Sequence, residues 1–181
     1  MRNQTGVTLL EMLITLAIVA IVLTTVAPNV QSILIQNRIT AEINELSGVI
    51  QYARHHAIDQ QIDTLVCPSD DFSSCTTNWG QAKMVFADEN GDGSRGNDEP
   101  ILAATGVTHP VNVLTGPNGS MRFLASGAVA APAVLRLCHE NDEAEYARAL
   151  TISLQGRVKM SRDDDNDGIH EDDTGAALDC N

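Results

Sequence analysis

Two acidic segments of the chain have the ligand spacing of a divalent-cation site. Residues 88–99 read DENGDGSRGNDE, and the positions that match the ligands and the turn glycine of an EF-hand loop are Asp88, Asn90, Asp92, Gly93 and Glu99. Strands rather than helices are expected on either side, and Arg95 stands where an apolar residue is usual. The alternative is a polar β-hairpin loop, for which Asn-Gly and Asp-Gly are favourable turn sequences.

The second segment, residues 163–173, reads DDDNDGIHEDD. It repeats the first half of the same spacing with Asp163, Asp165, Asp167 and Gly168, but Thr174 stands where the closing glutamate would lie. So many neighbouring carboxylates repel one another unless solvent or a cation screens them. The segment is therefore either a solvated acidic loop or a weak Ca²⁺ site of the class found outside cells. No cofactor is certain, and Ca²⁺ is the one cofactor that the sequence indicates.

Positive charge gathers in a single place, at Arg157, Lys159 and Arg162, in a chain whose net charge is −13. Arg157 and Lys159 alternate along an expected strand, so their side chains share a face. Such a strip could contact DNA phosphates weakly and without sequence preference, although the acidic run beside it opposes DNA. The alternative is a charged edge strand, on which Lys and Arg discourage aggregation.

The sequence shows no motif for catalysis. The four cysteines form no C-x-x-C pair and the histidines have no metal-ligand spacing, which argues against zinc. Neither a nucleophile motif nor a phosphate-binding glycine loop is present. We therefore expect a protein that is not an enzyme.

The four cysteines, Cys67, Cys75, Cys138 and Cys180, allow three complete pairings. Two disulfides are the natural expectation if the chain is exported. Cys67 and Cys75 lie close together around a Pro-Ser-Asp-Asp turn and should pair. Cys138, on an expected strand, would then hold the C-terminal tail through Cys180.

These residues must be positioned by one long helix and a set of strands. Residues 7–27 are apolar and long enough to cross a bilayer, and beyond Pro28 apolar residues continue at helical spacing. A helix over about 7–60 is predicted, with a kink at Pro28. The later residues alternate between short β runs and turns, which predicts an α+β fold with an antiparallel sheet. The expected strands are 64–67, 83–87, 101–104, 121–124, 134–138, 150–154 and 158–160.

A carboxylate within the apolar segment, Glu11, separates three interpretations of residues 1–27. A conventional signal peptide could be cleaved near Ala27, and a plain membrane anchor is also possible, but neither has a use for Glu11. A charge inside an apolar span is costly unless it finds a partner. Glu11 is explained if the segment later packs against other chains that supply a positive charge.

The N-terminal residues Gly6-Val7-Thr8-Leu9-Leu10-Glu11-Met12-Leu13 resemble the class III signal of type IV pilins and type II secretion pseudopilins. The resemblance implies that a prepilin peptidase cuts after Gly6, that Val7 becomes the methylated N-terminus, and that Glu11 acts in filament assembly. The usual residue after the cut is Phe, so Val7 is a mild departure. Physically, Glu11 of a neighbouring subunit could neutralise the new α-amine within the filament core.

The rest of the chain resembles the GspH/FimT family of minor pilins in the motifs QYAR at 51–54, VCPS at 66–69, WG at 79–80, FAD at 86–88, LC at 137–138 and ISLQGR at 152–157. The resemblance implies the pilin lollipop: a long helix whose second half packs on a β-rich domain. It divides the chain into a leader (1–6), a transmembrane or filament-core half-helix (7–27), an amphipathic half-helix (28–60) and a periplasmic domain (61–181).

The same resemblance implies a FimT/FimU-like minor pilin, or alternatively a GspH-type pseudopilin of type II secretion. Its partners would be other pilins or pseudopilins, the prepilin peptidase and the inner membrane. FimT proteins implicated in DNA uptake carry a Gly-Arg-x-Arg motif, which Gly156-Arg157-Val158-Lys159 matches with Lys in the last place. A membrane-anchored Ca²⁺-binding protein, with Glu11 incidental, is the alternative from another class.

Overall fold

The computed structural model describes residues 6–141 and 143–180, without the side chains of residues 25–29. Most of the expected leader, residues 1–5, therefore lies outside the described residues. The chain divides into two compact units, Met1–Asn37 and Arg38–Asn181. Each unit is described by itself.

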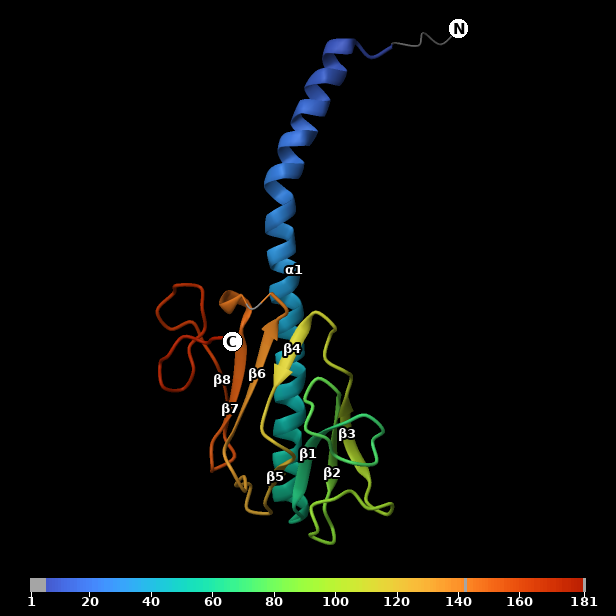
Figure 1. Cartoon of the computed structure of the whole chain (residues 1–181), viewed down its shortest axis with the longest axis vertical. Coiled ribbons are helices and arrows are strands. Elements are labelled where there is room, and N and C mark those ends of the chain that lie inside the picture. The colour runs from blue at the N-terminus through green and yellow to red at the C-terminus, as the bar shows by residue number, and fades with distance from the viewer. Residues whose placement is uncertain (1–5, 142, 181) are drawn as a thin grey trace. The chain divides into compact units, whose positions relative to one another are not determined.

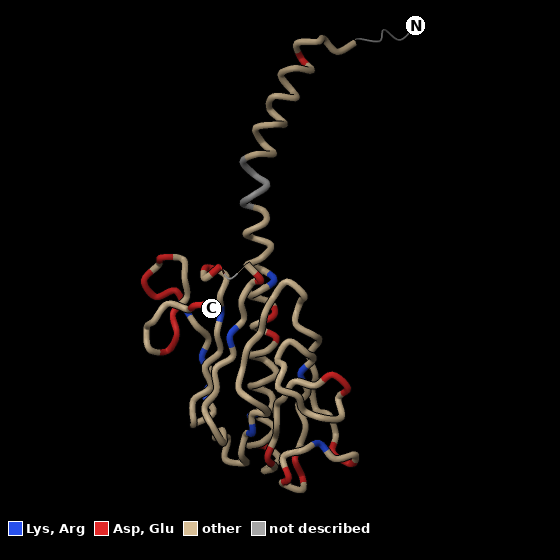
Figure 2. The backbone as a smooth tube through the Cα atoms, viewed as in Figure 1, with Lys and Arg blue, Asp and Glu red and all other residues tan. Residues whose placement is uncertain are grey.

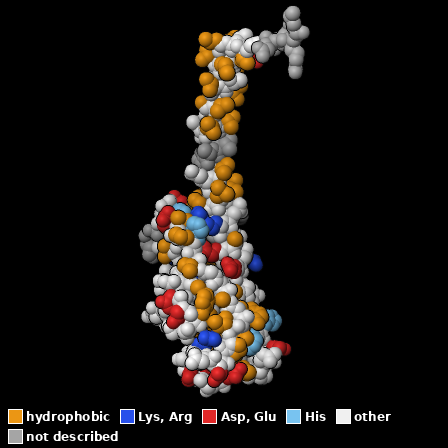
Figure 3. All heavy atoms as spheres, turned by 90° about the vertical axis from the view of Figure 1, so that its right-hand side faces the viewer, with side chains coloured by type: hydrophobic (Ala, Val, Ile, Leu, Met, Phe, Trp, Pro, Cys, Tyr) orange, Lys and Arg blue, Asp and Glu red, His pale blue; other side chains and the backbone are white. Residues whose placement is uncertain are grey.

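One helix, α1 (Leu9–Gln60), begins two residues later than expected and ends where it was expected to end. Thr8 caps its start, because the Thr8 hydroxyl accepts the Glu11 N–H at 3.3 Å. In the first unit the apolar side chains of the helix are exposed, and Figure 3 shows them over much of the visible face. Pro28 lies within α1, but its side chain is outside the described residues, so the kink stays a prediction.

The transmembrane half-helix expected over residues 7–27 stays a prediction. Within the described part of the chain, no helix is both long and apolar enough to cross a bilayer.

In the second unit α1 turns one apolar stripe inward. Its buried residues recur every three or four positions, as one face of a helix does, and are Ile39, Ile43, Leu46, Ile50, Ala53 and Ala57. These side chains belong to the core that the helix shares with the strands, which lie alongside it in Figure 1.

Two antiparallel sheets complete the second unit, where the sequence had indicated one. The first has the order β3-β2-β1-β5 and consists of β1 (Thr64–Ser69), β2 (Ala82–Ala87), β3 (Ile101–Thr105) and β5 (Met121–Phe123). The second has the order β4-β6-β7-β8 and consists of β4 (Asn112–Thr115), β6 (Ala133–His139), β7 (Arg148–Ile152) and β8 (Val158–Met160). A 3-10 turn, η1 (Ala144–Tyr146), joins β6 to β7.

The short strand β4 was not expected from the sequence. It has four residues between Pro110 and Pro117, which lack the backbone N–H that a longer ladder would need. Its partner is the long strand β6, with Val113 opposite Cys138. Tertiary pairing therefore decides this strand, because the local pattern is too short to reveal it.

The disulfides join Cys67 to Cys75 and Cys138 to Cys180, with Cα–Cα distances of 5.6 and 5.9 Å. This is the pairing expected from the sequence. The first bridge holds the loop after β1 against the sheet, so Phe72 and Cys75 pack on a cluster that includes Met84 and Phe86. The second bridge ties the C-terminal tail to β6, where Leu178 is buried.

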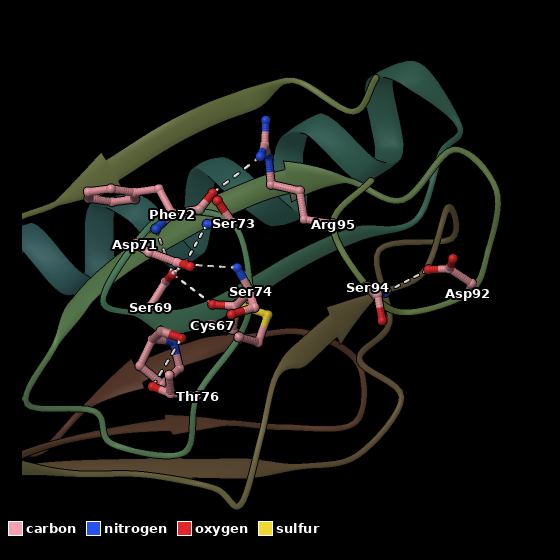
Figure 4. The surroundings of a disulfide bond; sticks show 12 residues. Cys67, Ser69, Asp71, Phe72, Ser73, Ser74, Thr76, Asp92, Ser94 and Arg95 are labelled. Atoms are coloured by element: carbon pink, nitrogen blue, oxygen red, sulfur yellow. Dashed lines mark hydrogen bonds between the residues drawn. A yellow bond between two sulfur atoms is a disulfide. The ribbon is translucent and has the colours of Figure 1, made fainter. Parts of the chain in front are cut away.

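Hydrogen bonds shape the loop that follows β1, as Figure 4 shows. The Asp71 carboxylate accepts the backbone N–H groups of Ser73 and Ser74 at 2.7 and 3.0 Å. These bonds favour the ionised form and lower the pKa of Asp71, which is fully exposed to solvent. The loop is thereby folded on itself while the disulfide fixes its end.

Candidate functional sites

The acidic loop 88–99 connects the paired strands β2 and β3, as the hairpin alternative predicted. Asp88 lies at its start with a fully buried side chain. The Asp88 Oδ2 atom accepts hydrogen bonds from the Gly93 N–H at 3.0 Å and from Arg122 Nη2 at 2.7 Å. The same guanidinium lies 3.7 Å from Asp63. Arg122 thus supplies the positive charge that a cation would bring to Asp88.

The closing glutamate of this loop is also engaged. Glu99 is buried, and its two oxygens accept the N–H groups of Glu89 at 2.9 Å and Gly96 at 2.7 Å. Within the described part of the chain, the three carboxylates of the expected set, Asp88, Asp92 and Glu99, do not converge on a point where an ion could sit. Loop 88–99 is a closed polar turn held by its own backbone and by Arg122.

The second acidic loop has the same hydrogen bonds from backbone N–H groups to side-chain oxygens as the first. Gly168 N–H donates to Asp163 Oδ2 at 3.0 Å, as Gly93 does to Asp88. The next two bonds also recur, from the fifth residue to the third and from the seventh to the fifth. The fourth and sixth residues are left-handed in both loops, at Gly91 and Gly93 and at Asn166 and Gly168. The two segments are therefore copies of one loop conformation.

The loops differ in their carboxylates. Asp163, Asp165, Asp167 and Glu171 bring one oxygen each within 4.8 Å of one another. No ion pair with Lys or Arg reaches this group among the residues that the structure describes. One oxygen of Asp163 is buried without a hydrogen-bond partner, as is the equivalent oxygen of Asp88, so the difference lies in the convergence of the carboxylates and in Arg122. An acidic cluster that could hold a metal is thus present in this loop.

Glu171 is the member of the group that the sequence did not reveal. The EF-hand pattern places the closing ligand at the twelfth position, Thr174, whereas Glu171 stands at the ninth. Its place is set by β-bridges to Arg162 and Ala177, which fold the tail back on itself. Burial, with a smaller effect of Arg148, lowers the pKa of the neighbouring His170.

The basic strip Arg157, Lys159 and Arg162 is exposed along and beside β8. None of the three forms an ion pair with any described residue. Lys159 and Arg162 nevertheless line a small hollow together with Asp164, Glu171, Asp172 and Asp173. Figure 2 shows how acidic positions dominate the C-terminal loops next to the strip. The strip is accessible, but negative charge lies against it.

Gly156, which precedes the strip, has a structural role. Its φ of +72° is left-handed, and a Cβ there would collide with the carbonyl of Gly127. Arg54 on α1 donates to that same carbonyl at 2.9 Å and to the Gln155 carbonyl at 3.3 Å. The glycine and Arg54 therefore lock α1 to the turns that flank β6, β7 and β8.

The expected processing residues, Gly6 and Val7, lie just before α1, and Glu11 lies in its first turn. Glu11 is exposed and has no ion pair within the described residues. A carboxylate in the first turn is favourable to the helix dipole. The functions expected for these three residues stay predictions.

Comparisons with known proteins agree with these features. Residues 42–156 match the family described as type II transport protein GspH, and residues 1–27 match the prokaryotic N-terminal methylation motif. No curated protein sequence is significantly similar to the chain.

Solved structures that resemble the fold at low sequence identity include two crystal forms of one minor pilin and one minor pseudopilin. A crystal structure of the type IV minor pilin FimU of Pseudomonas aeruginosa aligns with TM-score 0.55 and 18% identity, covering 70% of this chain and 90% of FimU. A second crystal form of FimU gives 0.52 and 18%, covering 68% and 92%. The minor pseudopilin EpsH of the Vibrio cholerae type 2 secretion system gives 0.49 and 16%, covering 67% and 94%.

Proposed function

The chain belongs to the GspH family of type II transport proteins, and we propose that it is a filament subunit: a minor pilin of a type IV pilus. The single observation that carries the proposal is the order of its parts. A prokaryotic N-terminal methylation motif over residues 1–27 precedes a GspH domain over 42–156, and the single helix α1 continues from one into the other. The long helix with its antiparallel β domain has the type IV pilin-like fold, which FimU shares.

Filament formation follows from the exposed apolar half of α1. Side chains such as Leu9, Leu16 and Leu23 are more than half exposed, and this surface must be covered. A helix stripe that packs on the next subunit without closing a ring generates a helical filament. Glu11 would then meet the free amine of a neighbouring Val7. A GspH-type pseudopilin of a type II secretion system is the alternative, with the same architecture and different partners.

Before assembly, the apolar half of the helix would be held in the inner membrane, with residues 38–181 in the periplasm. Two disulfides support this location, because disulfides persist in oxidising compartments. The proposal includes a prepilin peptidase that cuts after Gly6.

Processing is tested by co-expression with a prepilin peptidase, followed by intact-mass measurement. We expect loss of residues 1–6 and a methylated Val7. A mature chain that starts just after Ala27 would identify a conventional signal peptide and overturn the proposal. Processing after Gly6 would also discard the alternative of a membrane-anchored Ca²⁺-binding protein in which Glu11 is incidental.

Assembly is tested with Glu11→Ala and, as a matched control, Glu140→Ala on the exposed surface of the second unit. We expect Glu11→Ala to reach the membrane but to be missing from sheared filaments, and Glu140→Ala to be incorporated normally. Normal incorporation of Glu11→Ala would show that the carboxylate has no role in assembly. Comparing strains that lack the pilus or the secretion system identifies which filament the chain enters.

We also propose two binding properties for the surface around β8 and the loop that follows it. The exposed, unpaired strip Arg157, Lys159 and Arg162 favours weak DNA contact during uptake. The converging oxygens of Asp163, Asp165, Asp167 and Glu171 favour a weak Ca²⁺ site in the loop beside it.

A further inference from the structure

A pocket of about 390 Å³ opens in the second unit between α1 and the segment that joins β3 to β4. Its walls include Arg38, Glu42 and Glu45 from the helix, with Lys83, Val107 and His109 opposite. The volume is in the range that a small ligand or an inserted side chain fills. None of the functions proposed above uses this pocket.

The buried ammonium of Lys83 is the unusual group in the pocket. Lys83 lies on β2 with 3% of its surface exposed. Its Nζ atom donates one hydrogen bond, to the Thr108 hydroxyl at 2.7 Å, although an ammonium carries three donors. No carboxylate forms an ion pair with it among the described residues. Lysine is rarely buried without a partner, because water solvates its charge far better than a protein interior does.

The carboxylates that line the pocket, Glu42 and Glu45, do not form an ion pair with the Lys83 ammonium among the described residues. Each Glu42 oxygen accepts one hydrogen bond, from the His109 N–H at 3.1 Å and from Asn112 Nδ2 at 2.6 Å. Glu45 is exposed to solvent. Arg38 also lines the pocket. Two cationic groups, one of them a buried ammonium with unused donors, thus line one cavity together with Glu42 and Glu45.

A purely structural role explains Lys83 poorly. Its bond to Thr108 holds the segment between β3 and β4, and Thr108 in turn bonds the Trp79 carbonyl. A neutral donor would hold Thr108 equally well without burying a charge. The charge itself is explained if an anion enters the pocket.

We propose that this pocket receives the carboxylate of an Asp or Glu side chain from a neighbouring subunit. Ammonium and guanidinium groups both bind carboxylates through charge-assisted hydrogen bonds. At the rim, Val107 is 66% exposed and Pro110 is also exposed, so they offer apolar contact to the stem and backbone around that carboxylate. The identity of the partner as a subunit rests on the proposed function, but the recognition of a carboxylate does not.

The test uses the two lysines of the chain, Lys83 and Lys159. The full chain, labelled with ¹³C-lysine and held in detergent micelles, gives one Cε signal from each. The probes are acetyl-Ala-Glu-Ala-amide, the matched glutamine tripeptide and sodium acetate. We expect the glutamate peptide to shift the Lys83 signal saturably at roughly millimolar concentration, as a single weak charge pair would, while the Lys159 signal stays in place.

Variants locate the site. Followed on a peptide whose glutamate is labelled with ¹³C, binding should weaken about tenfold or more in Lys83→Met, since this variant removes one of two charge-assisted partners, and should be unchanged in Lys159→Met. Arg38→Gln is the second pocket variant and should also weaken binding, with the Lys83 signal as reporter of an intact fold.

An equal shift with the glutamine peptide, or none with either peptide, would overturn the proposal. A shift with acetate but not with the glutamate peptide would overturn the subunit as the source and identify a small-anion site. The titration needs no filament, so its result tests the pocket alone. The filament role is tested separately, by whether Glu11→Ala is excluded from filaments.

Discussion

At the scale of single residues, Arg122 distinguishes the two acidic loops. Both loops have the same turn and the same hydrogen bonds, but only loop 88–99 has a guanidinium on its first aspartate. A cation entering that loop would have to displace Arg122 and free Glu99 from two backbone N–H groups. In loop 163–171 Glu171 also accepts a backbone N–H, from Asp164 at 2.7 Å, but no guanidinium or ammonium forms an ion pair with its carboxylates among the described residues.

Calcium binding should therefore be lost with Asp167→Ala and kept with Asp92→Ala, which removes the equivalent carboxylate of the other loop. The expected affinity is weak, about 0.1–1 mM, as in extracellular calcium modules. Calorimetry of the full chain in detergent measures it. Equal loss in both variants would assign the ion to neither loop alone, and no heat at millimolar Ca²⁺ would leave loop 163–171 as a solvated turn.

The buried charge of Lys83 makes a second prediction at this scale. Lys83→Met should raise the free energy of unfolding by about 1 kcal/mol or more, because an unpaired buried charge is replaced by an apolar chain of similar length. Lys159→Met, on the exposed strip, should change it little. Chemical denaturation of the two variants measures the difference. A large loss of stability in Lys83→Met would show that the hydrogen bond from Lys83 to Thr108 stabilises the fold by more than the buried charge costs.

The pH dependence of that difference has a definite sign. Burial lowers the pKa of Lys83, and the smaller effects of Glu42 and Glu45 raise it. A lowered lysine pKa means that the unfolded chain binds this proton more tightly than the folded one. The penalty is full below the folded pKa and disappears as the pH rises to the ordinary lysine value. The advantage of Lys83→Met should therefore shrink across that alkaline window.

At the scale of elements, the two disulfides close loops of different length. Cys67 and Cys75 are separated by 8 residues, whereas Cys138 and Cys180 are separated by 42. The entropy that a crosslink removes from the unfolded chain grows with the loop. The bridge from β6 to the C-terminal tail should therefore be the more stabilising of the two.

Replacing Cys138 and Cys180 by alanine should cost about 4 kcal/mol, and replacing Cys67 and Cys75 about 2.5 kcal/mol. Urea denaturation of the two double variants provides the comparison. The reverse order would mean that packing of Phe72 and Cys75 on the first sheet outweighs loop entropy. Peptide mapping that joined Cys67 to Cys138 would contradict the pairing itself.

The elements differ in how far their sequence reveals them. The second half of α1 was predictable because Ile39, Ile43 and Ile50 repeat at helical spacing. β4 was not, since its four residues, NVLT, are too few to display a hydrophobic period in the sequence, although they alternate between buried and exposed in the fold. The division into two sheets also depends on long-range pairing, such as β1 with β5, that no local pattern encodes.

The same limit applies to the sites. Asp163, Asp165 and Asp167 follow a spacing that the sequence displays, whereas Glu171 joins them only through β-bridges in the tail. Arg122 reaches Asp88 from β5, which is 34 residues away. Lys83 is the one charged residue of the otherwise apolar strand β2, and the segment between β3 and β4 covers it. The positions of Glu171, Arg122 and Lys83 therefore depend on contacts between segments that are distant in the sequence.

At the scale of the whole molecule, the net charge of −13 governs what the basic strip can do. DNA approaching this surface is repelled over most of it and attracted only near β8. The acidic residues Asp164, Asp172 and Asp173 share a hollow with Lys159 and Arg162 and reduce that attraction further. Binding must therefore be weak, non-specific and sensitive to salt.

We predict that the full chain shifts duplex DNA in an electrophoretic assay at low salt only. Two or three phosphate contacts give a slope of about −2 to −3 in a plot of log affinity against log salt, so binding should vanish near physiological salt. Arg157→Gln with Lys159→Gln should abolish the shift without unfolding the protein, because both side chains are exposed and unpaired among the described residues. Arg95→Gln, which removes a charge outside the strip, is the control and should shift DNA as the wild type does.

Millimolar Ca²⁺ should strengthen binding, because an ion among Asp163, Asp165 and Asp167 would neutralise the repulsion beside Arg162. If the wild-type chain shifts no DNA, or the double variant shifts it equally well, the strip is a charged edge and the filament role stands alone.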